Sequence, residues 1–246
     1  MICPKCGFEN EDKKAECIKC GVIFSKYLKS RNASLEKNGR EHEEEKSYIP
    51  SLKDTIKDIL FSTDADSNRF YFAGRAITFT FLLILGLIMI LSPLGSGYAS
   101  NSFMHFVNLP FHEAGHIFFR PFGQWMTSFG GTLGQLMMPI ICLVVFLLKT
   151  RNPFGASVCI WWFGENFMDI TPYINDARSL SLPLIGGNVG ASSPYGFHDW
   201  EYILNEIGLI RYDHTIAKSS FGFGIVFILT AFAWGGFLLF KEYKEL

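Results

Sequence analysis

Long runs of uncharged, mostly apolar residues limit what this chain can fold into. Three such runs cover residues 76–94, 131–148 and 221–240. About 20 apolar residues in a helix are enough to cross the hydrocarbon core of a bilayer, which is roughly 30 Å thick. Each of these runs therefore predicts a membrane-spanning helix.

Two further runs are less uniform. Residues 154–170 are mostly apolar but include Glu165 and Asp169, and residues 103–120 are interrupted by Pro110. The first is expected to be a fourth span, whereas the second either crosses the membrane or only enters it. The chain is thus predicted to be an all-α polytopic membrane protein with four to five transmembrane helices.

The part of the chain before the first run has a different composition. Residues 25–70 are rich in charged side chains, which is typical of a flexible linker. Within this linker, one face of a predicted juxtamembrane amphipathic helix collects Leu52, Ile56, Ile59 and Leu60. Residues 71–246 follow as the membrane domain, and residues 171–218 form a long loop that we expect to be a partly ordered cap.

The overall charge argues against one class of partner. Nucleic-acid binders that rely on bulk charge are strongly basic. This chain has a formal net charge of −1, so no nucleic-acid partner is expected.

Residues 1–24 contain two CxxC pairs separated by ten residues, and each pair is followed by glycine. Four thiolates at this spacing are the ligand set of a structural zinc, and so short a segment needs a metal for its stability. The ligands would be Cys3, Cys6, Cys17 and Cys20. The segment resembles the small N-terminal zinc ribbons of many bacterial membrane proteins. We expect it to be a docking or regulatory element for a cytoplasmic protein partner.

An HExxH motif lies in the run that contains Pro110, with His112, Glu113 and His116 as its defining residues. Histidines four apart share one face of a helix, so both can bind one zinc ion, and the glutamate beside them can take a proton from a zinc-bound water. Buried in a membrane, these three side chains need partners. A metal satisfies all three; the alternative is a polar helix contact with no metal.

A catalytic zinc needs a third protein ligand and one open position. The sequence offers three acidic candidates at or after the end of the run 154–170, namely Glu165, Asp169 and Asp176. An acidic residue at membrane depth marks a functional site by default. Two acid–histidine pairs also lie in the loop 171–218, and of these we expect His198 at the surface or an interface rather than in the site. His105 is expected to be a packing residue.

The order of these elements resembles the core of the site-2 protease family of intramembrane zinc metalloproteases, over roughly residues 76–180. In that family two motif histidines and a distant aspartate bind zinc, and the glutamate is the base. The resemblance implies that His112 and His116 are ligands and that Glu113 is the catalytic base. It ranks Asp169 first as the third ligand, Asp176 second and Glu165 third.

One part of the family pattern is missing. The usual Asn…Pro…Leu-Asp-Gly sequence is absent, although Asn166 and residues 172–177 echo it loosely. This departure is the reason why Asp176 stays as the alternative third ligand.

The resemblance predicts a zinc-dependent intramembrane protease that cleaves membrane protein substrates within the lipid bilayer, with one catalytic and one structural zinc. A membrane metallohydrolase that does not cleave peptides and a non-enzymatic membrane scaffold with a zinc ribbon are the two alternatives. We expect an integral protein of a bacterial inner membrane, with its ribbon in the cytoplasm. The basic residues that flank the spans can all be cytoplasmic only if the motif helix does not cross.

Overall fold

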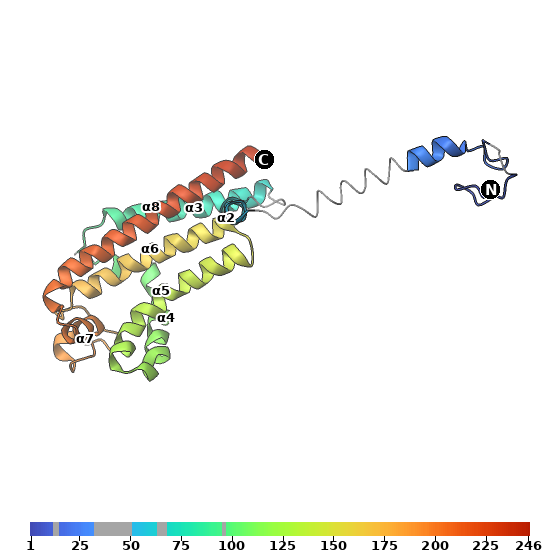
Figure 1. The fold of residues 1–246 in the computed structure, drawn as a ribbon. Helices are drawn as coiled ribbons and strands as arrows, with labels where there is room; N and C mark the ends of the chain where they lie inside the picture. Colours follow the sequence, from blue (N-terminus) through green and yellow to red (C-terminus); the bar gives the residue numbers. More distant parts are fainter. Residues whose placement is uncertain (12–14, 32–50, 63–67, 95–96) are drawn as a thin grey trace. The chain divides into compact units, whose positions relative to one another are not determined.

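The computed structural model describes residues 1–11, 15–31, 51–62, 68–94 and 97–246 (Figure 1). They form two compact units, Met1–Thr55 and Ile56–Leu246. The regular elements in these ranges are helices. The same ranges contain isolated β-bridges but no β-strand. The all-α prediction is therefore confirmed for the residues that the structure describes.

In the first unit, the two CxxC pairs form two copies of one backbone turn. The amide of Gly7 donates to the carbonyl of Cys3, and the amide of Gly21 donates to that of Cys17. Both glycines have a positive φ, 71° and 67°, which a residue without a Cβ adopts at no steric cost. A helical stretch follows over residues 24–31.

The second unit is a bundle of long helices with a short one at its rim. The α-helices from the linker onward are α2 (Leu52–Phe61), α3 (Arg69–Leu91), α4 (Phe103–Phe119), α5 (Gln124–Leu148), α6 (Pro153–Asn175), α7 (Asp199–Glu206) and α8 (Asp213–Glu245). Short 3-10 turns lie between them at Ala99–Asn101, Arg120–Phe122, Gly190–Ser192 and Ile210–Tyr212.

Three segments of this bundle are long and apolar enough to cross a membrane, namely α3, α5 and Ile210–Glu245, which includes α8. They coincide with three of the predicted spans. Helix α6 has 23 residues, as many as α3, but it buries Glu165, Asn166 and Asp169. A spanning role for α6 and for the motif helix α4 stays a prediction.

Small residues let the helix backbones touch. Helices α6 and α8 run antiparallel side by side (Figure 1). A Cβ added to Gly164 would lie 2.9 Å from the carbonyl oxygen of Gly224, and one added to Gly224 would lie 2.8 Å from that of Gly164. Helices α4 and α5 meet in the same way, because a Cβ on Gly130 would lie 2.8 Å from the carbonyl oxygen of Gly115. Close approach through small residues is the usual packing of membrane helices.

Helix α7 lies in the long loop that was expected to form a cap. Its apolar residues Trp200, Ile203 and Leu204 are buried against the last turns of α6 and the start of α8. The loop before it is tied to α8 by two bonds from Arg178 to the carboxylate of Asp213, at 2.8 and 2.7 Å. The start of α7 is thereby held at one defined place on the bundle.

Candidate metal centre

The two motif histidines lie on α4 with their ring orientation set by α5. Nδ1 of His112 lies 2.8 Å from Oε1 of Gln135, and Nδ1 of His116 lies 2.8 Å from the carbonyl oxygen of Thr127. An amide or backbone carbonyl oxygen only accepts a hydrogen bond, so each Nδ1 carries the proton. A neutral ring held in this way offers the lone pair of Nε2, which is how metal-binding histidines are oriented in proteins.

A carboxylate from the cap meets both free nitrogens. Oδ2 of Asp199, the first residue of α7, lies 3.2 Å from Nε2 of His112 and 3.3 Å from Nε2 of His116. Burial would raise the pKa of Asp199, but its polar contacts with the rings of His112 and His116 outweigh this effect and hold the pKa below its ordinary value. Asp199 is therefore ionised, as a metal ligand must be.

The two separations that involve Asp199 match those of a zinc site. Zinc bonds to nitrogen and oxygen of about 2.0–2.1 Å in a tetrahedron place neighbouring ligand atoms about 3.3 Å apart. The separations of Asp199 from the two histidines have this length. Two histidines and one carboxylate also form a donor set found in catalytic zinc sites, which keep a fourth position open.

A glycine on α5 keeps space free beside the histidine nitrogens. A Cβ added to Gly131 would lie 2.5 Å from Nε2 of His112 and 2.7 Å from Nε2 of His116. Even an alanine at this position would press on both donor atoms. The close approach of α5 at Gly131 is therefore compatible with the two histidines only because this residue has no side chain.

The motif glutamate faces outward. Glu113 is exposed, and one of its carboxylate oxygens lies within 4.8 Å of ligand nitrogens of His112 and His116. The position leaves this carboxylate in reach of water and of any molecule that approaches the histidines from outside the bundle.

The aromatic ring of Tyr173 supports the same site from α6. Its hydroxyl accepts a hydrogen bond of 3.0 Å from the backbone amide of Asp199. Its ring lies against those of His112 and His198, with centroid distances of 6.3 and 4.2 Å. Tyr173 thus connects the cap to the motif helix.

The structure does not bring Asp169, the preferred third ligand, to the motif histidines. Its carboxylate lies 2.9 Å from Nδ1 of His105 and accepts a 3.0 Å bond from Nδ2 of Asn108. Nδ2 of Asn108 also donates to Glu165, at 2.9 Å, and Oδ1 of Asn108 accepts from Nε1 of Trp162, at 2.8 Å. These residues form a polar contact that joins α4 to α6, although Oε1 of Glu165 is buried without a hydrogen-bond partner.

Asp176, the alternative third ligand, is also used elsewhere. It ends α6 and accepts hydrogen bonds from the hydroxyls of Ser179 and Ser181 and from the amides of Ser181 and Leu182. Burial would raise the pKa of Asp176, but these hydrogen bonds outweigh it and keep the pKa below its ordinary value. Asp176 organises the first turn of the cap and not the metal centre.

His198, expected at the surface or an interface, is fully buried. His198 is the N-cap of α7, and its Nδ1 accepts a hydrogen bond from the backbone amide of Glu201. Its Nε2 lies 3.5 Å from Oδ2 of Asp176. The ring therefore places the residue after it, Asp199, beside α4. Burial also lowers the pKa of His198, which favours the neutral ring that this cap requires.

The residue that the sequence reasoning missed is Asp199. It lies 87 positions after His112, and the acidic residues of α6 lie much nearer in the sequence. One sequence feature could have pointed to Asp199: the pair His198–Asp199 lies at the start of the amphipathic segment that forms α7.

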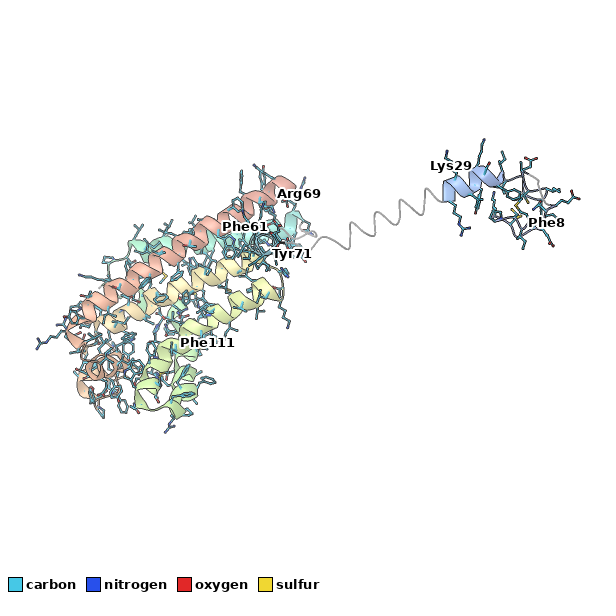
Figure 2. The ribbon with its side chains drawn as sticks, viewed as in Figure 1. Phe8, Lys29, Phe61, Arg69, Tyr71 and Phe111 are labelled. Carbon is cyan, nitrogen blue, oxygen red and sulfur yellow. The ribbon has the colours of Figure 1, made fainter. Side chains whose placement is uncertain are left out.

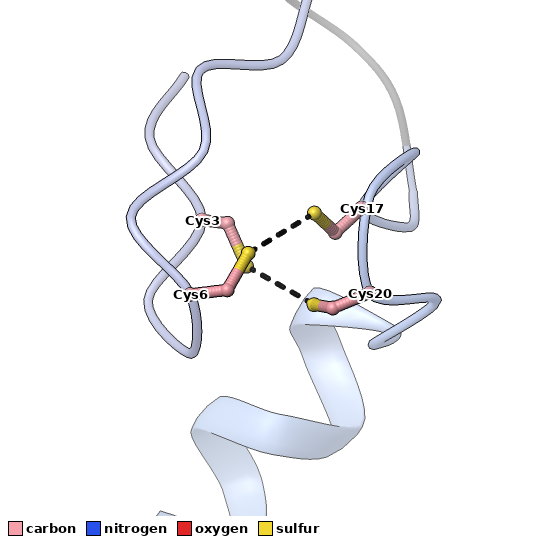
Figure 3. Close-up of side chains that lie close together, drawn as sticks. All are labelled: Cys3, Cys6, Cys17 and Cys20. Carbon is pink, nitrogen blue, oxygen red and sulfur yellow. Dashed lines mark hydrogen bonds between the residues drawn. The ribbon is translucent and has the colours of Figure 1, made fainter.

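The four cysteines of the first unit form a second cluster (Figure 3). Their sulfur atoms lie within 4.8 Å of one another, with 3.7 Å between Cys3 and Cys20 and 3.7 Å between Cys6 and Cys17. A disulfide bond is about 2.05 Å long, so these pairs are not bonded. Zinc–sulfur bonds of about 2.3 Å in a tetrahedron give a sulfur–sulfur separation of about 3.8 Å. The cluster has the geometry of a closed four-thiolate metal site.

Comparison with known protein families, with curated proteins and with solved structures finds no match to this chain.

Proposed function

We propose that the chain is a zinc-dependent hydrolase of the membrane that cleaves peptide bonds, with His112, His116 and Asp199 as zinc ligands and Glu113 as the base. The observation that carries this proposal is the approach of one Asp199 oxygen to both Nε2 atoms, at 3.2 and 3.3 Å, with both Nδ1 atoms already bonded. The choice of a peptide as substrate comes from the resemblance to site-2 proteases.

Each side chain has a separate task in this mechanism. A zinc ion in the site would polarise the scissile carbonyl and lower the pKa of a water molecule. Glu113 takes a proton from the attacking water and delivers it to the leaving amine. Gln135 and Thr127 hold the two rings so that their Nε2 atoms converge. Tyr173 and His198 hold Asp199 at the same point.

The cysteine cluster supplies a second zinc site with a structural role. Four thiolates leave no open position for water or substrate. We assign it no part in the hydrolysis, and it would stabilise a unit whose buried apolar residues are few.

Substitution of the base tests the proposal. Glu113→Gln should keep two zinc ions per chain and abolish turnover, so membrane proteins that wild type cleaves should accumulate uncleaved in cells that express the variant. The matched control is Glu206→Gln, which changes an exposed glutamate of α7 in the same way. If cells with Glu113→Gln and cells with wild type contain the same fragments, the protease mechanism is wrong. A change confined to lipids would identify a different substrate class.

A further inference from the structure

The basic residues of the bundle gather at one of its two ends. Nη1 of Arg75, near the start of α3, lies 3.0 Å from Oε1 of Glu242 near the end of α8, and its guanidinium lies over the ring of Phe154 at the start of α6. Nζ of Lys241 donates to the carbonyl of Phe61, the last residue of α2. We call this the basic end. Its basic residues are Arg69, Arg75, Lys149, Arg151, Lys241 and Lys244.

The other ends of the long helices lie away from the basic end. Helices α3 and α6 begin at the basic end and α8 finishes there. Each has at least 23 residues and so extends about 34 Å. Helix α5 also finishes at the basic end, because a link of four residues joins it to α6. Leu91, Gln124, Asn175 and Asp213 therefore mark a far end of the bundle.

Helix α4 begins and finishes at this far end. In the chain, α4 comes after α3, which finishes at the far end, and before α5, which begins at the far end. Its contacts agree with this path. His105 in its first turn reaches Asp169 in the last two turns of α6, and His116 in its last turn reaches Thr127 in the first turn of α5. In Figure 2, Arg69 and Tyr71 are labelled near the basic end, and Phe111 on α4 lies away from it.

Positive charge is unequal between the two ends. The far end has four basic residues, Arg120, Arg178, Arg211 and Lys218, and Arg178 is paired with Asp213. The basic end has six, and the other twelve of the 22 lysines and arginines precede α3 in the chain. Basic residues flanking membrane helices stay in the cytoplasm. This bias favours a cytoplasmic position for the basic end.

We infer that α4 is a re-entrant helix and that the metal centre is reached from the extracytoplasmic face of the membrane. The substrate would then be a membrane protein segment at its extracytoplasmic end. That this segment is a substrate rests on the proposed function. The side of the membrane from which the site is reached rests only on the helix directions and the distribution of charge.

The exposed face of α4 shows where such a segment would arrive. Ala114, Ile117 and Phe118 are exposed beside Glu113, and Phe103 and Phe106 are exposed on earlier turns. Glu113 is the only acidic residue of this helix, and the helix contains no lysine or arginine. The base therefore lies on a face that is otherwise apolar, which suits an apolar segment that moves in the outer leaflet.

Labelling of single cysteines with a membrane-impermeant maleimide tests the sidedness. Cys142→Ala and Cys159→Ala remove the thiols of the membrane domain, and labelled sites are assigned by peptide mass. New cysteines at Asn101 and Gln124 flank α4, one at Tyr195 lies in the cap, and controls at Lys149 and Lys244 lie at the basic end; all five positions are exposed. Asn101→Cys, Gln124→Cys and Tyr195→Cys should be labelled in intact bacterial cells. The labelling of Lys149→Cys and Lys244→Cys should rise above background only after the cells are permeabilised.

Two results would overturn the inference. Labelling of Asn101→Cys and Gln124→Cys from opposite sides would mean that α4 crosses the membrane. Protection of both positions in intact cells would put the site in the cytoplasm. Ser102→Cys and Phe122→Cys repeat the test if a first variant does not reach the membrane. Labelling needs neither zinc nor turnover, so loss of zinc or activity counts only against the proposed function.

Discussion

Oδ2 of Asp199 lies 3.3 Å from Nε2 of His116, although Asp199 belongs to the cap and His116 to α4. The same oxygen is 3.2 Å from His112. This relationship is why we propose Asp199 as the third ligand in place of Asp169, which the resemblance favours, and zinc content can decide between the two residues.

Metal content should therefore respond to Asp199 and not to the acids of α6. Asp199→Ala should reduce the zinc bound by purified protein from two ions per chain to one, because a ligand is lost. Asp169→Asn is the matched control and should keep both ions. Loss of a zinc from the control with retention in Asp199→Ala would restore the order of candidates that the resemblance implies.

The amide of Gln135 should tune the affinity for zinc without providing a ligand. Gln135→Leu removes the acceptor at Nδ1 of His112, so the ring is no longer held in one orientation. Loss of such a partner weakens metal binding by about 10- to 100-fold. Competition with a chelator of known affinity measures the change, and Gln124→Leu, at an exposed position at the start of the same helix, should leave the affinity unchanged.

A single methyl group at Gly131 should block the centre. Gly131→Ala places a Cβ 2.5 Å from Nε2 of His112, so one histidine must move away from the ligand geometry. We expect the protein to retain the zinc of the cysteine cluster and to lose the other ion. Gly222→Ala is the control, because a Cβ there meets nothing within 4 Å. Equal zinc content in the two variants would show that the space beside Gly131 has no connection with metal binding.

The polar contact between α4 and α6 should contribute to stability. Asn108→Leu removes the donor shared by Glu165 and Asp169 and the acceptor for Trp162. An unsatisfied buried polar group costs about 1–3 kcal/mol, and more if it is charged. We expect the unfolding temperature in detergent to fall by several degrees, whereas Asn205→Leu at an exposed position of α7 should change it little. An unchanged unfolding temperature for Asn108→Leu would mean that the network is not stabilising.

The cap should lose stability in acid through Asp176. The folded pKa of Asp176 lies below its ordinary value, so its hydrogen bonds stabilise the fold above the unfolded pKa of about 3.9. This contribution is lost as the pH falls through the folded pKa. The unfolding temperature of wild type should therefore exceed that of Asp176→Asn most clearly near neutral pH, and the difference should shrink in acid. A constant difference from pH 7 to pH 3 would contradict this role.

The sequence was sufficient for features that depend on local pattern. The spacing of the cysteines predicted a cluster whose four sulfur atoms do lie together, and long apolar runs predicted α3, α5 and α8. The HExxH spacing brought His112, Glu113 and His116 to one place on α4 because a helix repeats every 3.6 residues. Each of these features is decided within about 25 residues of chain.

The third carboxylate depended on packing across the whole fold. Asp199 reaches the histidines only because Trp200 and Leu204 are buried against α6 and α8 and because His198 is held near Asp176. No local pattern contains these contacts. The acids of α6 have polar partners of another kind: buried acids need partners, and Asn108 donates to both Glu165 and Asp169.

The contact between Asp199 and the motif histidines also bears on how the protein matures. Because one ligand comes from the cap and two from α4, a chain whose cap has not yet docked has only two of the three groups that would retain the ion. Under the proposed function, such a chain would be inactive, however well its other helices are packed. Docking of the cap would then be the step that makes an assembled helix bundle competent for hydrolysis.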